Sequence, residues 1–201
     1  MTPRPTPCGT VRQRPRRSAL TVLAVAAPLL LLASQLRLLP QDGGVLLEVA
    51  GRPVDAAGAL QASWQSLVRD CSKVQRWQAG SPPWIEAQQA LAAHSPPASW
   101  GARPLQLLQD VSGNWLLAEV LWDGPGAAGS SAPLDPAIVP LRRSAGGLLV
   151  QTAGVWSGDS SPWQAPVFIR QWLHRQIPDL PAMLPLCLDP QWPAFAGYQP
   201  L

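Results

Sequence analysis

Two histidines are the residues of this chain best suited to acid–base chemistry, and neither belongs to a catalytic pattern. His94 stands two residues before a Pro-Pro pair, and His174 lies between a leucine and an arginine. The sequence contains neither HExxH nor paired CxxC, and in the string closest to a GxSxG elbow, residues 154–158, the serine is misplaced by one position. The carboxylates have no spacing that pairs them: Glu48, Glu86, Glu119, Asp123 and Asp159. The sequence therefore predicts no catalytic residue, no metal ligand and no cofactor.

The chain has three cysteines, an odd number that raises the question of which one is left over. Cys8 precedes a predicted membrane segment, so it is expected in a reducing compartment as a free thiol. Cys71 and Cys187 fall on apolar stripes of two predicted helices that could pack together. A bridge between them would close a long loop and stabilise the fold by about 4–5 kcal/mol in the chain-entropy model. The alternative is two separate buried thiols that act as small hydrophobic residues.

Ten tryptophans against one tyrosine and two phenylalanines are the most unusual feature of the composition. Four of them fall on apolar faces of predicted elements and are expected in the core: Trp64, Trp77, Trp122 and Trp172. Trp156 and Trp163 lie at an element end and in a loop, beside glycine and proline, and form the candidate interaction surface. Such a surface could stack on sugars or lie at a membrane interface.

The elements that must position these residues form one predicted domain, residues 54–188, after a spacer at 40–53 and before an irregular tail at 189–201. Apolar residues at helical spacing predict an amphipathic helix whose stripe faces the core, with Asp55 as its amino cap: Leu60, Trp64, Leu67, Val68, Cys71, Val74 and Trp77. Further helices are expected at 83–93, 166–177 and 180–188. Alternating segments predict two hairpins, 105–122 and 137–156. The fold class is α+β, with an antiparallel sheet of about four strands and flanking helices.

The amino-terminal residues indicate a membrane anchor. Residues 1–17 are rich in arginine and proline, contain no acidic residue, and predict a disordered cytoplasmic tail. Residues 18–39 contain the apolar run from Ala19 to Ala33 and are long enough to cross a bilayer as a transmembrane helix. Arginines gathered before the run orient the amino terminus toward the cytoplasm and the domain outward, in a single-pass protein of the cell membrane or an internal membrane. A cleaved signal peptide and a buried helix of a soluble protein are the alternatives.

The charge distribution argues against a nucleic-acid partner. Six of the fifteen basic residues precede Asp42, the first acidic residue, so the rest of the chain carries nine basic and twelve acidic residues. A protein that binds a polyanion is expected to carry its positive excess on the folded part. The predicted partners are therefore the membrane and a membrane protein, rather than DNA or RNA.

The segment LLVQTAGVWSGDSSPWQAPVFIRQWLHRQIPDLP, residues 148–181, resembles the end of accessory proteins found with exosortase systems in cyanobacteria. In both, an apolar strand ends in tryptophan, and a proline-bearing loop leads into a helix rich in tryptophan, glutamine and arginine. The tail, single span and outer domain also resemble single-pass bacterial anchored proteins. No functional residue is carried over from this resemblance.

Two functional hypotheses follow from the sequence. The first is a non-catalytic accessory or scaffolding module that is anchored in the membrane and assists a membrane complex. The second is an extracytoplasmic hydrolase that acts on a cell-envelope polymer. A deep cavity joining two carboxylates, or His174 with a serine or cysteine, would favour the hydrolase, whereas an apolar patch would favour the module.

Overall fold

The computed structural model describes residues 36–41, 44–94, 101–122, 136–158 and 160–190. The predicted tail at 1–17, most of the predicted anchor at 18–39 and nearly all of the tail at 189–201 lie outside these ranges. Within them, the structure has no helix that is long and apolar enough to cross a membrane.

The described part of the chain begins with a small antiparallel sheet, where the sequence predicted the end of the anchor and a spacer. The prediction that the transmembrane helix extends to residue 39 is wrong for residues 36–39, because they belong to a strand that pairs along its whole length with the next one and leave only residues 18–35 for an anchor. Its strands pair in the order β1-β2-β3, and Leu36 at the start of β1 lies opposite Val49 at the end of β2. Ala50 and Gly51 join β2 to β3 with positive φ angles of 51° and 78°, as in the two-residue turns of tight hairpins. The strands are β1 (Leu36–Gln41), β2 (Gly44–Val49) and β3 (Arg52–Val54).

The first large helix, α2 (Ala56–Val68), is shorter than the sequence predicted. Its predicted cap is confirmed, because the Asp55 side chain accepts a hydrogen bond from the backbone N–H of Gly58. After Val68 the chain leaves the helix, makes a 3-10 turn, η1 (Cys71–Lys73), and forms strand β4 (Val74–Trp77). The prediction that the helix continues to Trp77 is therefore wrong, since apolar residues three apart also fit a turn followed by a strand.

The main sheet is antiparallel and has the strand order β4-β5-β6-β7-β8, with β9 paired to β7. The α+β class is confirmed, but the sheet has six strands rather than about four, because β4 and β9 come from segments predicted as helix and hairpin end. Both predicted hairpins are present, and β6 is central with apolar side chains buried on both faces. The strands are β5 (Ala102–Asp110), β6 (Trp115–Trp122), β7 (Ala137–Ser144), β8 (Gly147–Val150) and β9 (Trp156–Ser157), with a 3-10 turn, η3 (Thr152–Gly154), before β9.

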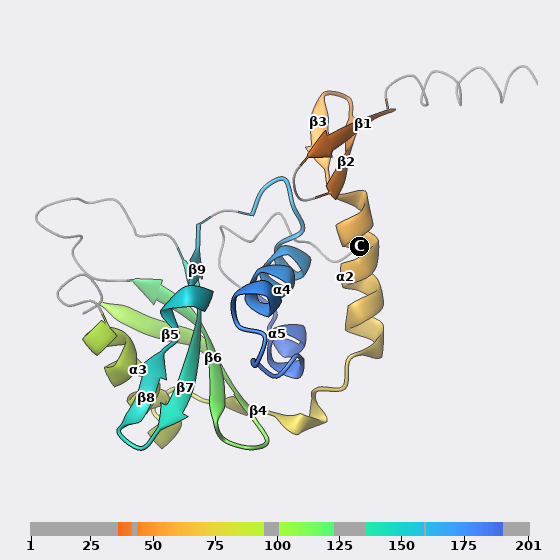
Figure 1. The fold of residues 1–201 in the computed structure, drawn as a ribbon. Helices are drawn as coiled ribbons and strands as arrows, with labels where there is room; N and C mark the ends of the chain where they lie inside the picture. The colour runs from red at the N-terminus through yellow and green to blue at the C-terminus, as the bar shows by residue number, and fades with distance from the viewer. Residues whose placement is uncertain (1–35, 42–43, 95–100, 123–135, 159, 191–201) are drawn as a thin grey trace, which may run out of the picture.

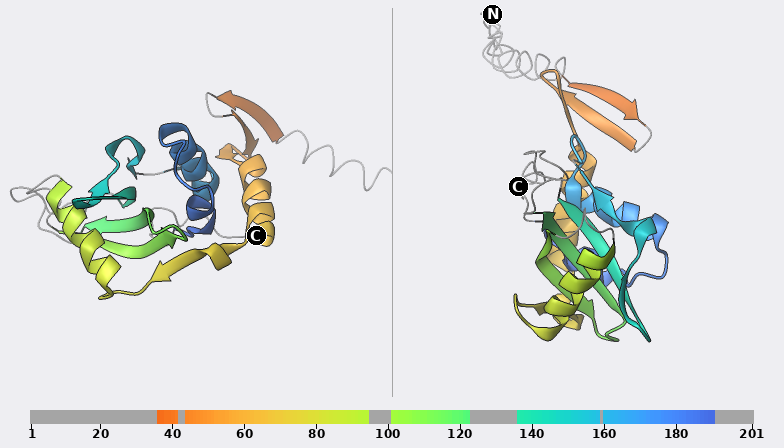
Figure 2. Two further views of the ribbon diagram at one scale, coloured as in Figure 1. Left: turned by 60° about the horizontal axis from the view of Figure 1, so that its bottom comes forward. Right: turned by 90° about the vertical axis from the view of Figure 1, so that its left-hand side faces the viewer.

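Helices cover both faces of the main sheet (Figure 1). Helix α3 (Pro82–His94) packs Ala87 and Leu91 into one core with Leu116 and Leu141. Helices α4 (Ala165–Gln176) and α5 (Met183–Cys187) build the opposite core, which includes Leu117, Ile138, Leu173 and Leu184. Helix α2 lies outside the layer of α4 and α5, as Figure 1 and the left view of Figure 2 both show. It is the outermost layer on that side of the domain.

Candidate functional site: the outward face of helix α2

Four large apolar side chains of α2 point away from the domain. Leu60, Trp64, Leu67 and Val68 are 72%, 65%, 80% and 57% exposed. Their spacing places them on one side of the helix, and we call these four residues the α2 face. The prediction that these four residues face the core is wrong, and Trp64 is not a core residue. The other three residues of the predicted stripe, Cys71, Val74 and Trp77, do pack partly buried against the cores. The amphipathic pattern is real, but its apolar side is turned outward.

The inward side of α2 is small and polar. Gly58 and Ala62 are its buried residues, and they let the backbone approach α4 closely. Gln65 lies on the same side, where its amide oxygen accepts a hydrogen bond from the guanidinium of Arg170 in α4. No residue of α2 is charged. The helix therefore docks onto the domain through small and hydrogen-bonding groups rather than through its large apolar side chains.

Asp55 holds the beginning of α2. Its carboxylate accepts hydrogen bonds from the backbone N–H of Gly58 at 2.7 Å and of Gln164 at 3.1 Å, and the side chain is nearly buried. Gln164 is the cap residue of α4, so one carboxylate joins the starts of both helices. A Cβ atom on Gly58 would lie 2.0 Å from an Asp55 carboxylate oxygen. Glycine is thus required at position 58 while this cap is in place.

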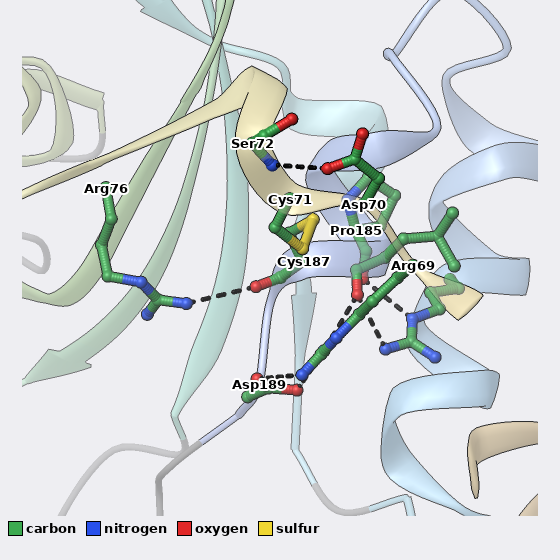
Figure 3. Close-up of a disulfide and its surroundings, with 10 residues drawn as sticks. Arg69, Asp70, Cys71, Ser72, Arg76, Pro185, Cys187 and Asp189 are labelled. Atoms are coloured by element: carbon green, nitrogen blue, oxygen red, sulfur yellow. Dashed lines mark hydrogen bonds and ion pairs between the residues drawn. A yellow bond between two sulfur atoms is a disulfide. The ribbon is translucent and has the colours of Figure 1, made fainter. Parts of the chain in front are cut away.

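Three arginines bind the carboxyl end of α5, and two of them, Arg69 and Arg170, also link it to α2. Arg69, which follows α2, makes two hydrogen bonds to the Asp189 carboxylate, at 2.6 and 2.9 Å, and a third to the carbonyl oxygen of Leu186 at 3.1 Å. Arg170 donates to the carbonyl oxygens of Pro185 and Leu186, and Arg76 donates to that of Cys187 (Figure 3). The last carbonyls of a helix lack partners within it, and these guanidinium groups supply them for α5.

Cys71 and Cys187 form a disulfide in the structure. Their sulfur atoms are 2.03 Å apart, and their Cα atoms are 5.8 Å apart (Figure 3). Of the two alternatives left open by the sequence, the structure has the bridge and not two separate thiols. The bond joins the turn after α2 to the end of α5, beside the ion pair of Arg69 and Asp189. Cys8 lies outside the described residues.

Two cavities lie along the seam between α2 and α4. One, of about 210 Å³, is lined by residues that include Asp55, Trp163 and Arg175. The other, of about 260 Å³, is lined by residues that include Arg170 and His174, and its lining contains no serine, cysteine or carboxylate. Both volumes are below the range of about 300–1,000 Å³ that is usual for small-molecule sites. His94, the other histidine, is the exposed last residue of α3.

Glu119 is the carboxylate whose burial the sequence analysis did not anticipate. It is fully buried in β6 and accepts a hydrogen bond of 2.6 Å from the side-chain amide of Gln106 in β5. The same amide group donates to the backbone carbonyl of Asp189, and Arg76 donates to the Gln106 side-chain oxygen. The network ties three strands to the chain after α5. Its signal in the sequence was a glutamate on a strand whose neighbours are all apolar.

The remaining predicted carboxylates are separated from Glu119. Glu86 in α3 forms an ion pair with Arg143 at 2.7 Å, and Glu48 in β2 lies opposite Arg37 in β1. Asp123 and Asp159 lie outside the described residues. Glu48, Glu86 and Glu119, the predicted carboxylates that the structure describes, therefore lie in three different elements and have different neighbours.

The candidate surface of Trp156 and Trp163 is not formed. Trp156 is only 7% exposed, and its ring meets that of Phe168 edge to face, with the ring centroids 6.1 Å apart. Pairing of β9 with β7 draws Trp156 into the core, which short-range sequence patterns could not show. Trp163 is half-buried and lines the smaller cavity beside Gly44 of the small sheet. Trp77 and Trp172 pack partly buried against the cores as predicted, and the side chain of Trp122 lies outside what the structure describes.

No family model, no curated protein and no solved structure matches this chain.

The Asp55 cap predicts a stability change. Asp55→Ala removes the acceptor for two backbone N–H groups and should lower the free energy of unfolding by about 1–2 kcal/mol. Urea unfolding of the detergent-solubilised full chain measures this. The matched control is Asp179→Ala at an exposed position, which should change stability by less than about 0.5 kcal/mol. Equal effects of the two substitutions would contradict the role of Asp55.

The disulfide predicts a definite thiol count. In the unfolded but unreduced full chain, one of the three cysteines should react with a thiol reagent, and all three should react after reduction. Reduction should also lower the free energy of unfolding by about 4–5 kcal/mol, because the bond closes a loop of more than 100 residues. Three reactive thiols before reduction would show that the bridge is absent.

Asp70, beside the disulfide, predicts a pH dependence. The Ser72 side chain, then the Ser72 backbone N–H, and then the Lys73 charge hold the pKa of this exposed carboxyl below its usual 3.8, against a small opposing effect of burial. A lowered folded pKa stabilises the fold above the unfolded pKa, and this contribution disappears as the pH falls through the folded pKa. The stability difference between wild type and Asp70→Asn should therefore be constant near neutral pH and shrink below pH 3.8. A difference that widens in acid would refute this.

Proposed function

We propose that this chain is a membrane-anchored, non-catalytic accessory module that docks a membrane-protein partner through the α2 face. The observation that carries the proposal is the orientation of α2: four large apolar side chains face outward on an uncharged helix that is held to the domain by its small and polar side. Protein interfaces are depleted in charge and enriched in tryptophan at their centres. The α2 face has both properties.

The proposed partner element is an apolar helix. Positions 60, 64, 67 and 68 follow the i, i+4, i+7, i+8 spacing with which one helix packs against another or into a groove. An anchor at residues 18–35, continuous with the small sheet, would keep α2 near the outer parts of other membrane proteins. A partner that is itself a membrane protein follows from that tether.

The proposed topology has a cytoplasmic amino terminus and an extracytoplasmic domain. The arginine cluster before the apolar run supports it. The disulfide supports it independently, since such bonds persist in oxidising compartments and are rare in the cytosol. A separate argument concerns the accessory role in a membrane complex. It is supported by the resemblance of residues 148–181 to exosortase-associated proteins.

The hydrolase hypothesis stays a prediction without a supporting observation. It called for a cavity that joins two carboxylates, or that brings His174 to a serine or cysteine. The cavity beside His174 offers neither among the residues that line it.

Site-specific photocrosslinking tests the docking proposal. A photoreactive amino acid at position 64 should give a discrete adduct with one membrane protein in intact cells, whereas one at position 89, exposed on α3 across the domain, should not. Leu67→Glu should abolish the adduct from position 64, because a charge on the α2 face would be desolvated on docking. Val111→Glu is the matched control, since Val111 is 77% exposed and distant in sequence, in the turn after β5.

Both glutamate variants should keep wild-type stability to within about 0.5 kcal/mol, because both sites are exposed. An adduct that survives Leu67→Glu, or that disappears equally with Val111→Glu, would exclude the α2 face as the docking surface.

A further inference from the structure

One face of the small sheet β1–β3 is apolar and exposed. Residues opposite one another in antiparallel strands share a face, and so do residues two apart in one strand. The register therefore groups seven apolar residues on one side, which we call the sheet face: Leu36, Leu38, Pro40, Val45, Leu47, Val49 and Val54. Leu38 is 71% exposed and Val45 is 51% exposed, and only Leu47 is partly covered.

The other side of the small sheet faces the domain. Leu46 in β2 is fully buried there, and Gly44 lies beside the ring of Trp163. Leu46 and Gly44 thus attach the sheet to the domain, while six of the seven residues of the sheet face remain exposed, with Val45 at the rim of the smaller cavity. A contiguous apolar surface of this kind on a folded domain marks an interaction site.

The position of the sheet in the chain indicates what covers the sheet face. Only Ser34 and Gln35 separate the apolar run that ends at Ala33 from the first residue of β1. Three peptide steps span at most about 10 Å, so a sheet that follows a membrane-spanning run must lie at the membrane surface. Resting on the anchor of the proposed function, we infer that the sheet face lies against the lipid bilayer, at the boundary of headgroups and acyl chains.

The area of the sheet face favours lipid over a second copy of the chain. The two strands of six residues are about 20 Å long and β3, with three residues, is about 10 Å long, so at about 4.8 Å per strand the face covers about 240 Å². A stable dimer needs about 800 Å² from each partner. Lipid contact needs no such minimum, because the anchor would hold the sheet at the bilayer permanently. Arg52, exposed at the edge of the same face, suits the phosphates of the headgroups.

Fluorescence from single labelled cysteines tests this inference in the full chain, with Cys8→Ser as background and the Cys71–Cys187 bridge intact. An environment-sensitive dye at Leu38→Cys reports the sheet face. The matched control is Arg37→Cys, because Arg37 is exposed in the same strand and points to the opposite side. Val25→Cys, within the apolar run, reports the anchor separately. Each protein is reconstituted into phosphatidylcholine–phosphatidylglycerol vesicles, with or without lipids that carry a nitroxide high on the acyl chain.

The dye at position 38 should shift to the blue and be quenched by the nitroxide lipid, and the dye at position 37 should do neither. Equal quenching at 37 and 38, or none at 38, would overturn the inference. A crosslink between the cysteines at position 38 of two copies, without quenching by the nitroxide lipid, would overturn the inference and indicate a dimer. Quenching of the dye at position 25 without quenching at position 38 would support the anchor and contradict lipid contact by the sheet face. Quenching at position 38 without quenching at position 25 would contradict the anchor and support lipid contact by the sheet face.

Discussion

The covalent bond between Cys71 and Cys187 fixes α2, which is, among the helices that the structure describes, the one that the two hydrophobic cores do not hold. Helix α2 lies outside α4 and α5 and buries only small residues, so its place depends on its two ends. The disulfide and the Arg69–Asp189 ion pair secure the end near α5, and the Asp55 carboxylate secures the start near α4. Because the ends are fixed in this way, the large apolar side chains of α2 are free to face outward.

This arrangement forgoes stability that a conventional packing of α2 would supply. Burial of a large apolar side chain contributes about 1.5–3 kcal/mol to the free energy of unfolding. The four outward residues of α2 do not make this contribution. The disulfide alone contributes about 4–5 kcal/mol in the chain-entropy model, which offsets much of that loss. A partner that covers the α2 face would recover the missing burial contribution as binding energy. The cross-links hold α2 in place, and the α2 face is the surface that the proposed partner would cover.

The sequence predicted those parts of the fold that depend on local patterns. The hairpin of β5 and β6, the Asp55 cap and the central position of β6 follow from alternation, turn residues and a capping side chain. Periodicity showed that α2 is amphipathic but not which side meets the domain, because that depends on how residues 165–176 pack beside it. Leu36 to Leu39 extended an apolar run, and nothing in those four residues separated a strand from the end of a span. Trp156 was misassigned since its burial comes from a pairing between β9 and β7.

The exposed apolar side chains are concentrated rather than scattered. Of the twelve large ones on the described part of the chain, nine lie between Leu36 and Val68, from the end of the predicted anchor onward. The polar groups that the fold buries, Glu119 and Gln106 among them, lie in the main sheet and are bonded to one another. The proposed contact of the sheet face with the bilayer rests on its short distance along the chain from the proposed anchor, and the proposed protein contact of the α2 face rests on helical spacing. The part of the chain from Leu36 to Val68, of which the structure describes 31 residues, therefore carries most of these exposed apolar side chains, and the main sheet with its helices forms the support behind them.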